Sequence, residues 1–234
     1  MPSNQNLHLT KVAVLTSSVI IISTTAAVLT LADAARERNG ITVVDPRIAT
    51  ETLSLRDSAL TVLAHVLTFL GSEIVVGGLA VVLLLVLLVR RQIDPAFTLA
   101  LAIGGSVTLT IAVKQLVMRV RPGPVDVLGP VDHSFSFPSG HTLNSTVFIG
   151  VVVYLLARRF QQPLKRTLIV VSGIGLAAGV GLSRIYLGYH WATDVIASWL
   201  IAVAWLTIVL LITSALGTEV ERRTSPHLNR ILRR

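Results

Sequence analysis

SRIYLGYHWATD, residues 183–194, follows an apolar stretch of membrane length and runs into another, yet it contains Arg184, His190 and Asp194. Ionisable side chains beside a bilayer are costly, which makes them functional candidates. The planar guanidinium of Arg184 matches phosphate oxygens. His190 and Asp194 are four residues apart, so on one helix face the carboxylate binds one ring nitrogen and leaves the other nucleophilic. The segment predicts phosphate chemistry, although a structural His–Asp pair would have the same spacing.

A second polar patch, residues 114–122, follows another apolar stretch. Lys114 and Arg121 are seven residues apart, about two helical turns, so a continuing helix places both on one face. Pro122 then ends the helix, and Arg119 points elsewhere. The patch predicts two cations for phosphate oxygens. Snorkelling of both side chains at a membrane edge is the alternative.

A third patch, Pro138–His141, leads directly into an apolar stretch. Unpaired N–H groups and a partial positive charge at a helix N-terminus suit a phosphate. Gly140 allows close approach of the backbone, and Ser139 offers a hydroxyl donor or a helix cap. His141 is then placed to protonate a leaving oxygen. A capped helix start with a bystander histidine is the alternative.

The composition indicates a membrane protein without cysteine chemistry. Hydrophobic residues make up 53% of the 234 residues and charged residues 14%, against about 25% charged in a soluble domain. Mean hydropathy is +0.75. Because cysteine is absent, disulfides, thiolate zinc sites and cysteine nucleophiles are excluded. The net charge of +8 is not gathered into one patch with interleaved aromatics, so no nucleic-acid partner is expected.

Six apolar stretches approach the ~20 residues that a spanning helix needs, which predicts an all-α polytopic membrane protein with one domain over residues 1–234. The stretches are 12–32, 74–89, 95–113, 142–157, 167–182 and 191–216. Ala32-Asp33-Ala34 resembles a signal-peptidase site. The apolar run before it is longer than the about 7–15 residues of a signal-peptide core, so a retained helix is expected.

An interfacial amphipathic helix, residues 53–71, is predicted before the second span. One continuous helix from Ser58 to Val89 would be about 48 Å long, more than a ~30 Å hydrocarbon core requires. Gly71-Ser72 interrupts the run. A helix on the membrane surface followed by a spanning helix therefore fits better.

Six spans place both termini on one side. Arg90-Arg91 and the Arg158–Arg166 turn mark the cytoplasm under the positive-inside rule, so cytoplasmic termini are expected in a multi-pass cell-membrane protein. The basic tail, 219–234, could contact anionic lipid heads or simply be solvated. All three patches then meet at the extracytoplasmic face.

In order and without a gap, the patches match K-x6-R-P, P-S-G-H and S-R-x5-H-x3-D. The chain thereby resembles the type 2 phosphatidic acid phosphatase superfamily, which includes vanadium-dependent haloperoxidases and bacterial acid phosphatases. The resemblance implies that His190 attacks phosphorus to form a phosphohistidine, that His141 protonates the leaving group and then activates water, and that Asp194 orients His190. It also implies a set of groups that hold the phosphoryl oxygens: Lys114, Arg121, Ser139, Gly140 and Arg184.

Three fixed cations remove the need for a divalent metal, so no metal or other cofactor is expected, and no cluster has metal-ligand spacing. The expected function is hydrolysis, at the outer leaflet, of phosphatidic acid, phosphatidylglycerol phosphate or a polyprenyl diphosphate such as undecaprenyl diphosphate. The choice of lipid stays open, because it depends on helix faces and on the loop Gly123–Phe137. Phosphate transfer to another lipid is an alternative, and a haloperoxidase is disfavoured because those resemble longer soluble proteins. A small transporter is disfavoured because transporter sites lie near the bilayer midplane.

Overall fold

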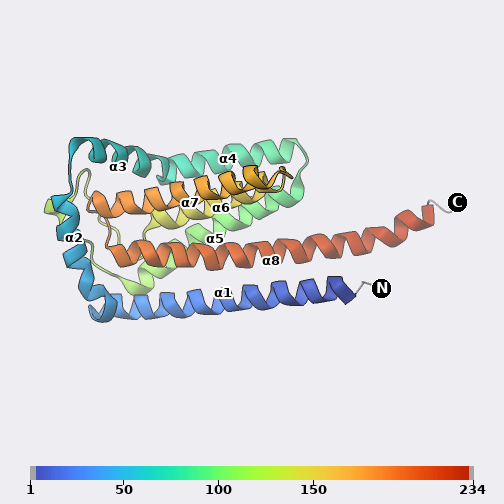
Figure 1. Cartoon of the computed structure of the whole chain (residues 1–234), viewed down its shortest axis with the longest axis horizontal. Helices are drawn as coiled ribbons and strands as arrows, with labels where there is room; N and C mark the ends of the chain where they lie inside the picture. Colours follow the sequence, from blue (N-terminus) through green and yellow to red (C-terminus); the bar gives the residue numbers. More distant parts are fainter. Residues whose placement is uncertain (1–3, 232–234) are drawn as a thin grey trace.

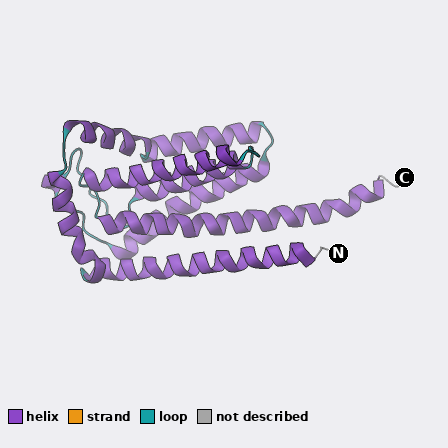
Figure 2. Ribbon diagram, in the orientation of Figure 1, coloured by secondary structure: helices purple, strands orange, loops and turns teal. Residues whose placement is uncertain are grey.

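The computed structural model is a bundle of long helices packed side by side (Figures 1 and 2), and it describes the backbone of residues 4–231 and the side chains of residues 12–216. Two short 3-10 helices accompany the α-helices: η1 (Gly40–Val44) and η2 (Pro124–Asp126). The α-helices are α1 (Asn4–Glu37), α2 (Asp45–Ser54), α3 (Ser58–Leu70), α4 (Glu73–Val89), α5 (Ile93–Val117), α6 (Gly140–Ala157), α7 (Pro163–Tyr186) and α8 (Ala192–Ile231).

The number of membrane-length elements confirms the predicted polytopic all-α fold. Among the described residues, α1, α5, α6, α7 and α8 are each long and apolar enough to cross a membrane. The pair α3–α4 supplies a sixth candidate, bent by 43° at the break between its two helices. The side chain of Ser72 caps α4 by accepting a hydrogen bond from the amide of Val75 at 3.3 Å, so the predicted interruption has a local cause.

The helix predicted over 53–71 is shorter at its start than expected. It begins at Ser58, because the carboxylate of Asp57 accepts hydrogen bonds from the amides of Ala59 (2.8 Å) and Leu60 (2.9 Å). Leu53 and Ser54, which were expected in this helix, belong to the end of the separate helix α2. Helix α3 packs on α7, and its position in the membrane interface stays a prediction.

One end of the bundle gathers the polar patches. The start of α1 and the end of α8 lie together at the opposite end (Figure 1). The turn between α7 and α8, the loop after α5 and the start of α6 lie at the end where α2 crosses the bundle (Figure 1). Helix α8 continues through Ile231, so the backbone of the predicted tail is helical as far as that residue. The tail's side chains lie outside the described residues.

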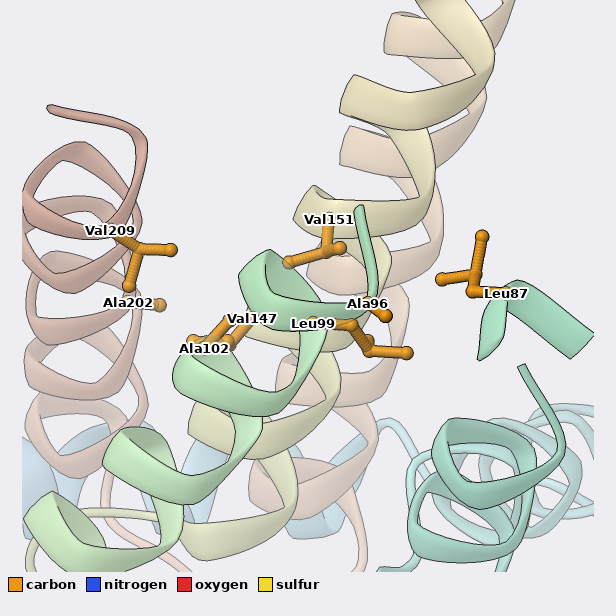
Figure 3. Close-up of a cluster of buried hydrophobic side chains, with 8 residues drawn as sticks. All are labelled: Leu87, Ala96, Leu99, Ala102, Val147, Val151, Ala202 and Val209. Carbon is orange, nitrogen blue, oxygen red and sulfur yellow. The ribbon is translucent and has the colours of Figure 1, made fainter. Parts of the chain in front are cut away.

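One buried core of the bundle is built from small and branched side chains. Buried residues of α4, α5, α6 and α8 meet in one cluster (Figure 3): Leu87, Ala96, Leu99, Ala102, Val147, Val151, Ala202 and Val209. Small residues allow helices in a bilayer to approach closely. The indole of Trp205 on α8 donates to the carbonyl of Ala102 at 2.8 Å and lies against the surface of α5.

Adding a methyl group at Gly105 should destabilise the bundle, because a Cβ there would lie 1.9 Å from Cζ2 of Trp205. Overpacking of this kind costs about 1–3 kcal/mol. The adjacent Gly104 is a matched control, since a Cβ there meets nothing within 4 Å. We expect thermal unfolding in detergent at a lower temperature for Gly105→Ala and no decrease for Gly104→Ala. Equal unfolding temperatures for the two variants would contradict the close helix contact.

Candidate active site

Helix α5 ends earlier than the sequence predicts. Its last residue is Val117, and Met118 adopts a left-handed conformation with φ +50° while its amide donates to the carbonyl of Lys114 at 2.9 Å. The expected continuous helix from Lys114 to Arg121 is therefore wrong. Arg121 lies in the loop after the helix, which turns back over the end of α5.

Lys114 and Arg121 nevertheless meet, as predicted. Both donate to the hydroxyl of Ser134, Lys114 Nζ at 3.2 Å and Arg121 Nη2 at 2.9 Å. Arg121 Nη2 also pairs with Oδ2 of Asp132 at 2.6 Å. Burial alone raises the pKa of Asp132, but the hydrogen bonds from Ser134 and the charges of Arg121 and Lys114 outweigh it and leave the pKa below its ordinary value. Arg121 is thus paired with an ionised carboxylate of the protein.

Arg121 also determines which ring nitrogen of His190 carries the proton. Its Nη1 lies 3.1 Å from Nε2 of His190 and donates to the carbonyl of Tyr189 at 2.7 Å. A guanidinium can only donate, so Nε2 must be the acceptor and the ring proton is on Nδ1. Nδ1 faces Oδ2 of Asp194 at 3.4 Å. This is the tautomer in which Nε2 can act as a nucleophile.

His190 lies in the turn before α8, which begins at Ala192, and not on the helix itself. The predicted shared helix face is therefore wrong, although the two side chains meet. The amides of Tyr189 and His190 both donate to the carbonyl of Arg184, at 3.0 and 3.2 Å, and this closes the turn. Burial lowers the pKa of His190 to about 3 and outweighs the opposing contact with Asp194, so the imidazole is neutral at pH 7.

Asp194 has acceptor contacts on both oxygens. Oδ2 accepts hydrogen bonds from the hydroxyl of Ser136 and from the amide of Trp191 at 3.0 Å. Oδ1 lies 2.5 Å from Nη1 of Arg119. Arg119 has other partners than Arg121, and it reaches the predicted site through Asp194.

The side chain of Arg184 is almost entirely buried beside the same turn. Its Nη1 donates to the hydroxyl of Thr68 on α3 at 2.6 Å, and its guanidinium lies 3.9 Å from the ring centroid of Tyr189. Its Nε has no hydrogen-bond partner among the described residues. A guanidinium held by stacking with a free donor is suited to an incoming anion.

Helix α6 begins at Gly140, as the sequence predicts. The hydroxyl of Ser139 accepts hydrogen bonds from the amide (3.4 Å) and the hydroxyl (2.9 Å) of Thr142, so Ser139 caps the helix. A Cβ at Gly140 would lie 3.3 Å from Cγ2 of Thr110. His141 follows in the first turn of α6. The charges of Arg184 and Arg121 and the ring of His190 contribute to the electrostatic potential at its side chain.

A cavity of about 780 Å³ opens beside Arg121 and Tyr189. Its lining comes from the loop after α5 and from the turn before α8, with Arg119, Arg121, Asp132, His133, Ser134 and Tyr189 as its polar residues. Among the described residues, no group of three or more His, Asp or Glu could hold a metal ion. Of the five predicted side chains only Arg121 is in this lining. The charges of Arg121 and Arg184 act on both His141 and His190, and the charge of Arg121 acts on Lys114, so these five side chains do lie close together.

Two residues of the site's surroundings were not among the predicted ones. Arg119 was excluded by its position two residues from Arg121. Asp45, buried to 1% exposure, pairs with Arg119 at 2.6 Å. No local pattern in the sequence connects Asp45, at the start of α2, with the motifs.

The chain is similar in sequence to proteins of known family. Residues 95–217 match the model of the PAP2 superfamily. The chain is 30% identical over 167 residues to phosphatidylglycerophosphatase B of Bacillus subtilis (strain 168), covering 70% of this chain and 80% of that relative. It is 31% identical over 129 residues to an undecaprenyl-diphosphatase of Sulfolobus acidocaldarius, covering 53% of this chain and 58% of that relative.

Two solved structures share the fold. One is the crystal structure of a transmembrane PAP2 type phosphatidylglycerolphosphate phosphatase from Bacillus subtilis, with a TM-score of 0.75 and 26% identity over 83% of this chain and 96% of that chain. The other is LpxE of Aquifex aeolicus, with a TM-score of 0.58 and 26% identity over 71% of this chain and 94% of that chain.

Proposed function

The chain belongs to the PAP2 superfamily, and from this premise we propose that it is a membrane lipid phosphatase that acts through a phosphohistidine on His190. The observation that carries the proposal is the orientation of this ring. Nε2 lies 3.1 Å from a donor nitrogen of Arg121, and Nδ1 lies 3.4 Å from the carboxylate of Asp194. A neutral imidazole with its free nitrogen among cations is suited to attack phosphorus.

In the first step, Nε2 of His190 forms a bond to phosphorus while the bond from phosphorus to the lipid oxygen breaks. His141 transfers its proton to that oxygen. In the second step, His141 removes a proton from water, the water oxygen bonds to phosphorus, and the bond to Nε2 breaks to release inorganic phosphate. Lys114, Arg121 and Arg184 would stabilise the charge on the phosphoryl oxygens throughout.

Binding of the phosphate would exchange one anion for another. In the free protein, Arg121 pairs with Asp132 at 2.6 Å and also covers Nε2 of His190. A phosphate offers three acceptor oxygens and more negative charge than a carboxylate, so it would displace this pairing and expose Nε2 to phosphorus. The hydroxyl of Ser139 and the Gly140 backbone would complete the phosphate site at the start of α6.

We propose a glycerolipid phosphate monoester as the first substrate, because the match to a phosphatidylglycerophosphatase B extends over 80% of that relative. A polyprenyl diphosphate is the second candidate, from the shorter match to an undecaprenyl-diphosphatase. The connection between α4 and α5, which contains Arg90-Arg91, and the connection between α6 and α7, which contains Arg158-Arg159, lie at the opposite end of the bundle from the turn between α7 and α8 (Figure 1). The positive-inside rule then supports cytoplasmic termini and an extracytoplasmic site.

The test is phosphate release by the purified protein in EDTA. Phosphatidylglycerol phosphate, phosphatidic acid and a long-chain prenyl diphosphate are supplied in parallel, with His190→Ala as the control. Release that persists in EDTA and is lost in the variant supports a metal-independent hydrolase. Transfer of the phosphate to an added lipid alcohol, seen as a new phosphorylated lipid without release of inorganic phosphate, would identify a phosphotransferase instead, and unchanged substrate under both conditions would contradict the proposal.

A further inference from the structure

Arg119 is a buried cation held between two carboxylates from distant parts of the chain. Its side chain is 9% exposed, with Nη2 lying 2.6 Å from Oδ2 of Asp45 and Nη1 lying 2.5 Å from Oδ1 of Asp194. Nη1 also donates to the hydroxyl of Thr193 at 2.8 Å. The guanidinium lies 5.6 Å from the ring centroid of Trp191. Arg119 is therefore held by two carboxylates, a hydroxyl and one aromatic ring of the protein itself.

Asp45 joins the same network to the first turn of α8. Its Oδ1 accepts a hydrogen bond from the amide of Thr193 at 3.1 Å, and its Oδ2 accepts one from the hydroxyl of Thr193 at 2.5 Å. The first amides of a helix lack intrahelical partners, so Asp45 acts as a cap supplied from 148 residues away. The start of α2 thus holds the start of α8, where Asp194 lies.

The contact with Arg119 fixes the orientation of the carboxylate of Asp194. Because Arg119 holds Oδ1, only Oδ2 is available to Nδ1 of His190. Charge-assisted bonds of this kind fix geometry as well as charge. Loss of the cation would leave Oδ1 buried without a partner, and such a group rotates or draws in another donor. His190 would then lose the carboxylate oxygen that its Nδ1 faces at 3.4 Å.

We infer that Asp45 and Arg119 are positioning residues, which hold the carboxylate of Asp194 in the orientation that fixes His190. The inference rests on the proposed function, since it assigns the two residues to the same reaction. Asp45 lies outside the stretch of the chain that matches the family model, residues 95–217. The segment before the second candidate span therefore completes the site.

Phosphate binding is the competing role for Arg119, and the two roles predict different kinetics. A group that acts only through Asp194 changes kcat and leaves substrate binding alone, whereas a phosphate ligand changes binding as well. We expect Asp45→Asn and Arg119→Lys to lower kcat by roughly 10–100-fold, as is usual for residues that orient a reacting group. KM and the inhibition constant of inorganic phosphate should stay within about twofold of the wild type.

Matched controls are available on α2. Arg47 and Glu51 pair only at the surface, with side chains 82% and 61% exposed. Glu51→Gln matches the change of acid to amide in Asp45→Asn, and Arg47→Lys matches Arg119→Lys. Both controls should keep the kcat of the wild type. Thermal unfolding in detergent establishes that each variant is folded before its kinetics are compared.

The inference would be overturned by an unchanged kcat in folded Asp45→Asn, or by a loss confined to KM and phosphate inhibition. If Asp45→Asn and Arg119→Lys both fail to fold, Thr193→Val tests the inference instead. This change keeps every charge and removes the hydroxyl between Asp45 and Arg119. It should lower kcat several-fold, and an unchanged kcat would overturn the inference. Wild-type protein without phosphatase activity, or an active His190→Ala variant, would refute the proposed function instead.

Discussion

Replacing His190 by alanine should reduce phosphate release by roughly 10⁴-fold or more, because the variant lacks the atom that bonds to phosphorus. No other imidazole can take its place, since the nearby His141 has the separate role of proton transfer. The measurement is inorganic phosphate released from phosphatidylglycerol phosphate in detergent micelles. The loss should appear in kcat, with the fold preserved, because the buried ring contributes little to the core.

His65→Ala is the matched control for this change. His65 lies on α3, is exposed and has no role in the proposed site, so its removal should leave the rate unchanged. Wild-type protein stopped in alkali during turnover of substrate with labelled phosphate should also carry label, because phosphohistidine survives in alkali and is lost in acid. Substantial turnover by His190→Ala, or label that resists acid, would rule out His190 as the nucleophile.

The parts of the fold that could be predicted depend on residues close to one another in the sequence. A spanning helix requires an apolar run of bilayer length, so the spans and the break before Glu73 are visible in the sequence. A helix cap depends on one side chain and the next few amides, which explains why the cap role of Ser139 is among the roles that the sequence indicates. Each of these features lies within a few neighbouring residues.

The predictions that failed depend on left-handed backbone conformations just after a helix. Met118 ends α5 in a left-handed conformation, with φ +50°, which an ordinary side chain rarely adopts. His190 leaves the helix for the same kind of reason, since the turn before it uses Gly188 at φ +80°. A Cβ at Gly188 would meet the carbonyl of Asp126 at 2.5 Å. The predicted pairs, Lys114 with Arg121 and His190 with Asp194, are nevertheless in proximity, although neither pair shares a helix face.

Asp45 could not have been found from one sequence. Its partners, Arg119 and Thr193, are 74 and 148 residues away, and only the packing of α2 across the end of the bundle brings them together. An acidic residue in the first turn of a helix is usually a surface residue. Burial to 1% exposure between an arginine and a helix start is a property of the folded chain alone.

Replacing His141 by alanine should slow turnover of a lipid phosphate by roughly 10²–10⁴-fold, the usual contribution of general acid–base catalysis. The lipid oxygen is a poor leaving group, so it needs the proton that His141 supplies. An aryl phosphate with an acidic phenol as its leaving group needs no such proton. The first step should therefore be nearly as fast in His141→Ala as in the wild type when this substrate is used.

The second step still needs His141, because water must lose a proton as it attacks the phosphohistidine. His141→Ala with the aryl phosphate should therefore release a rapid burst of phenol, about one equivalent per active site, followed by slow turnover, which is the kinetic sign of a covalent intermediate. Stopped-flow absorbance of the phenolate measures both phases. Asn144→Ala provides a matched change one turn further along α6, and it should show no burst because it does not act on the water. An equal loss of rate with both substrates and no burst would mean that His141 supports the structure of the site and transfers no proton.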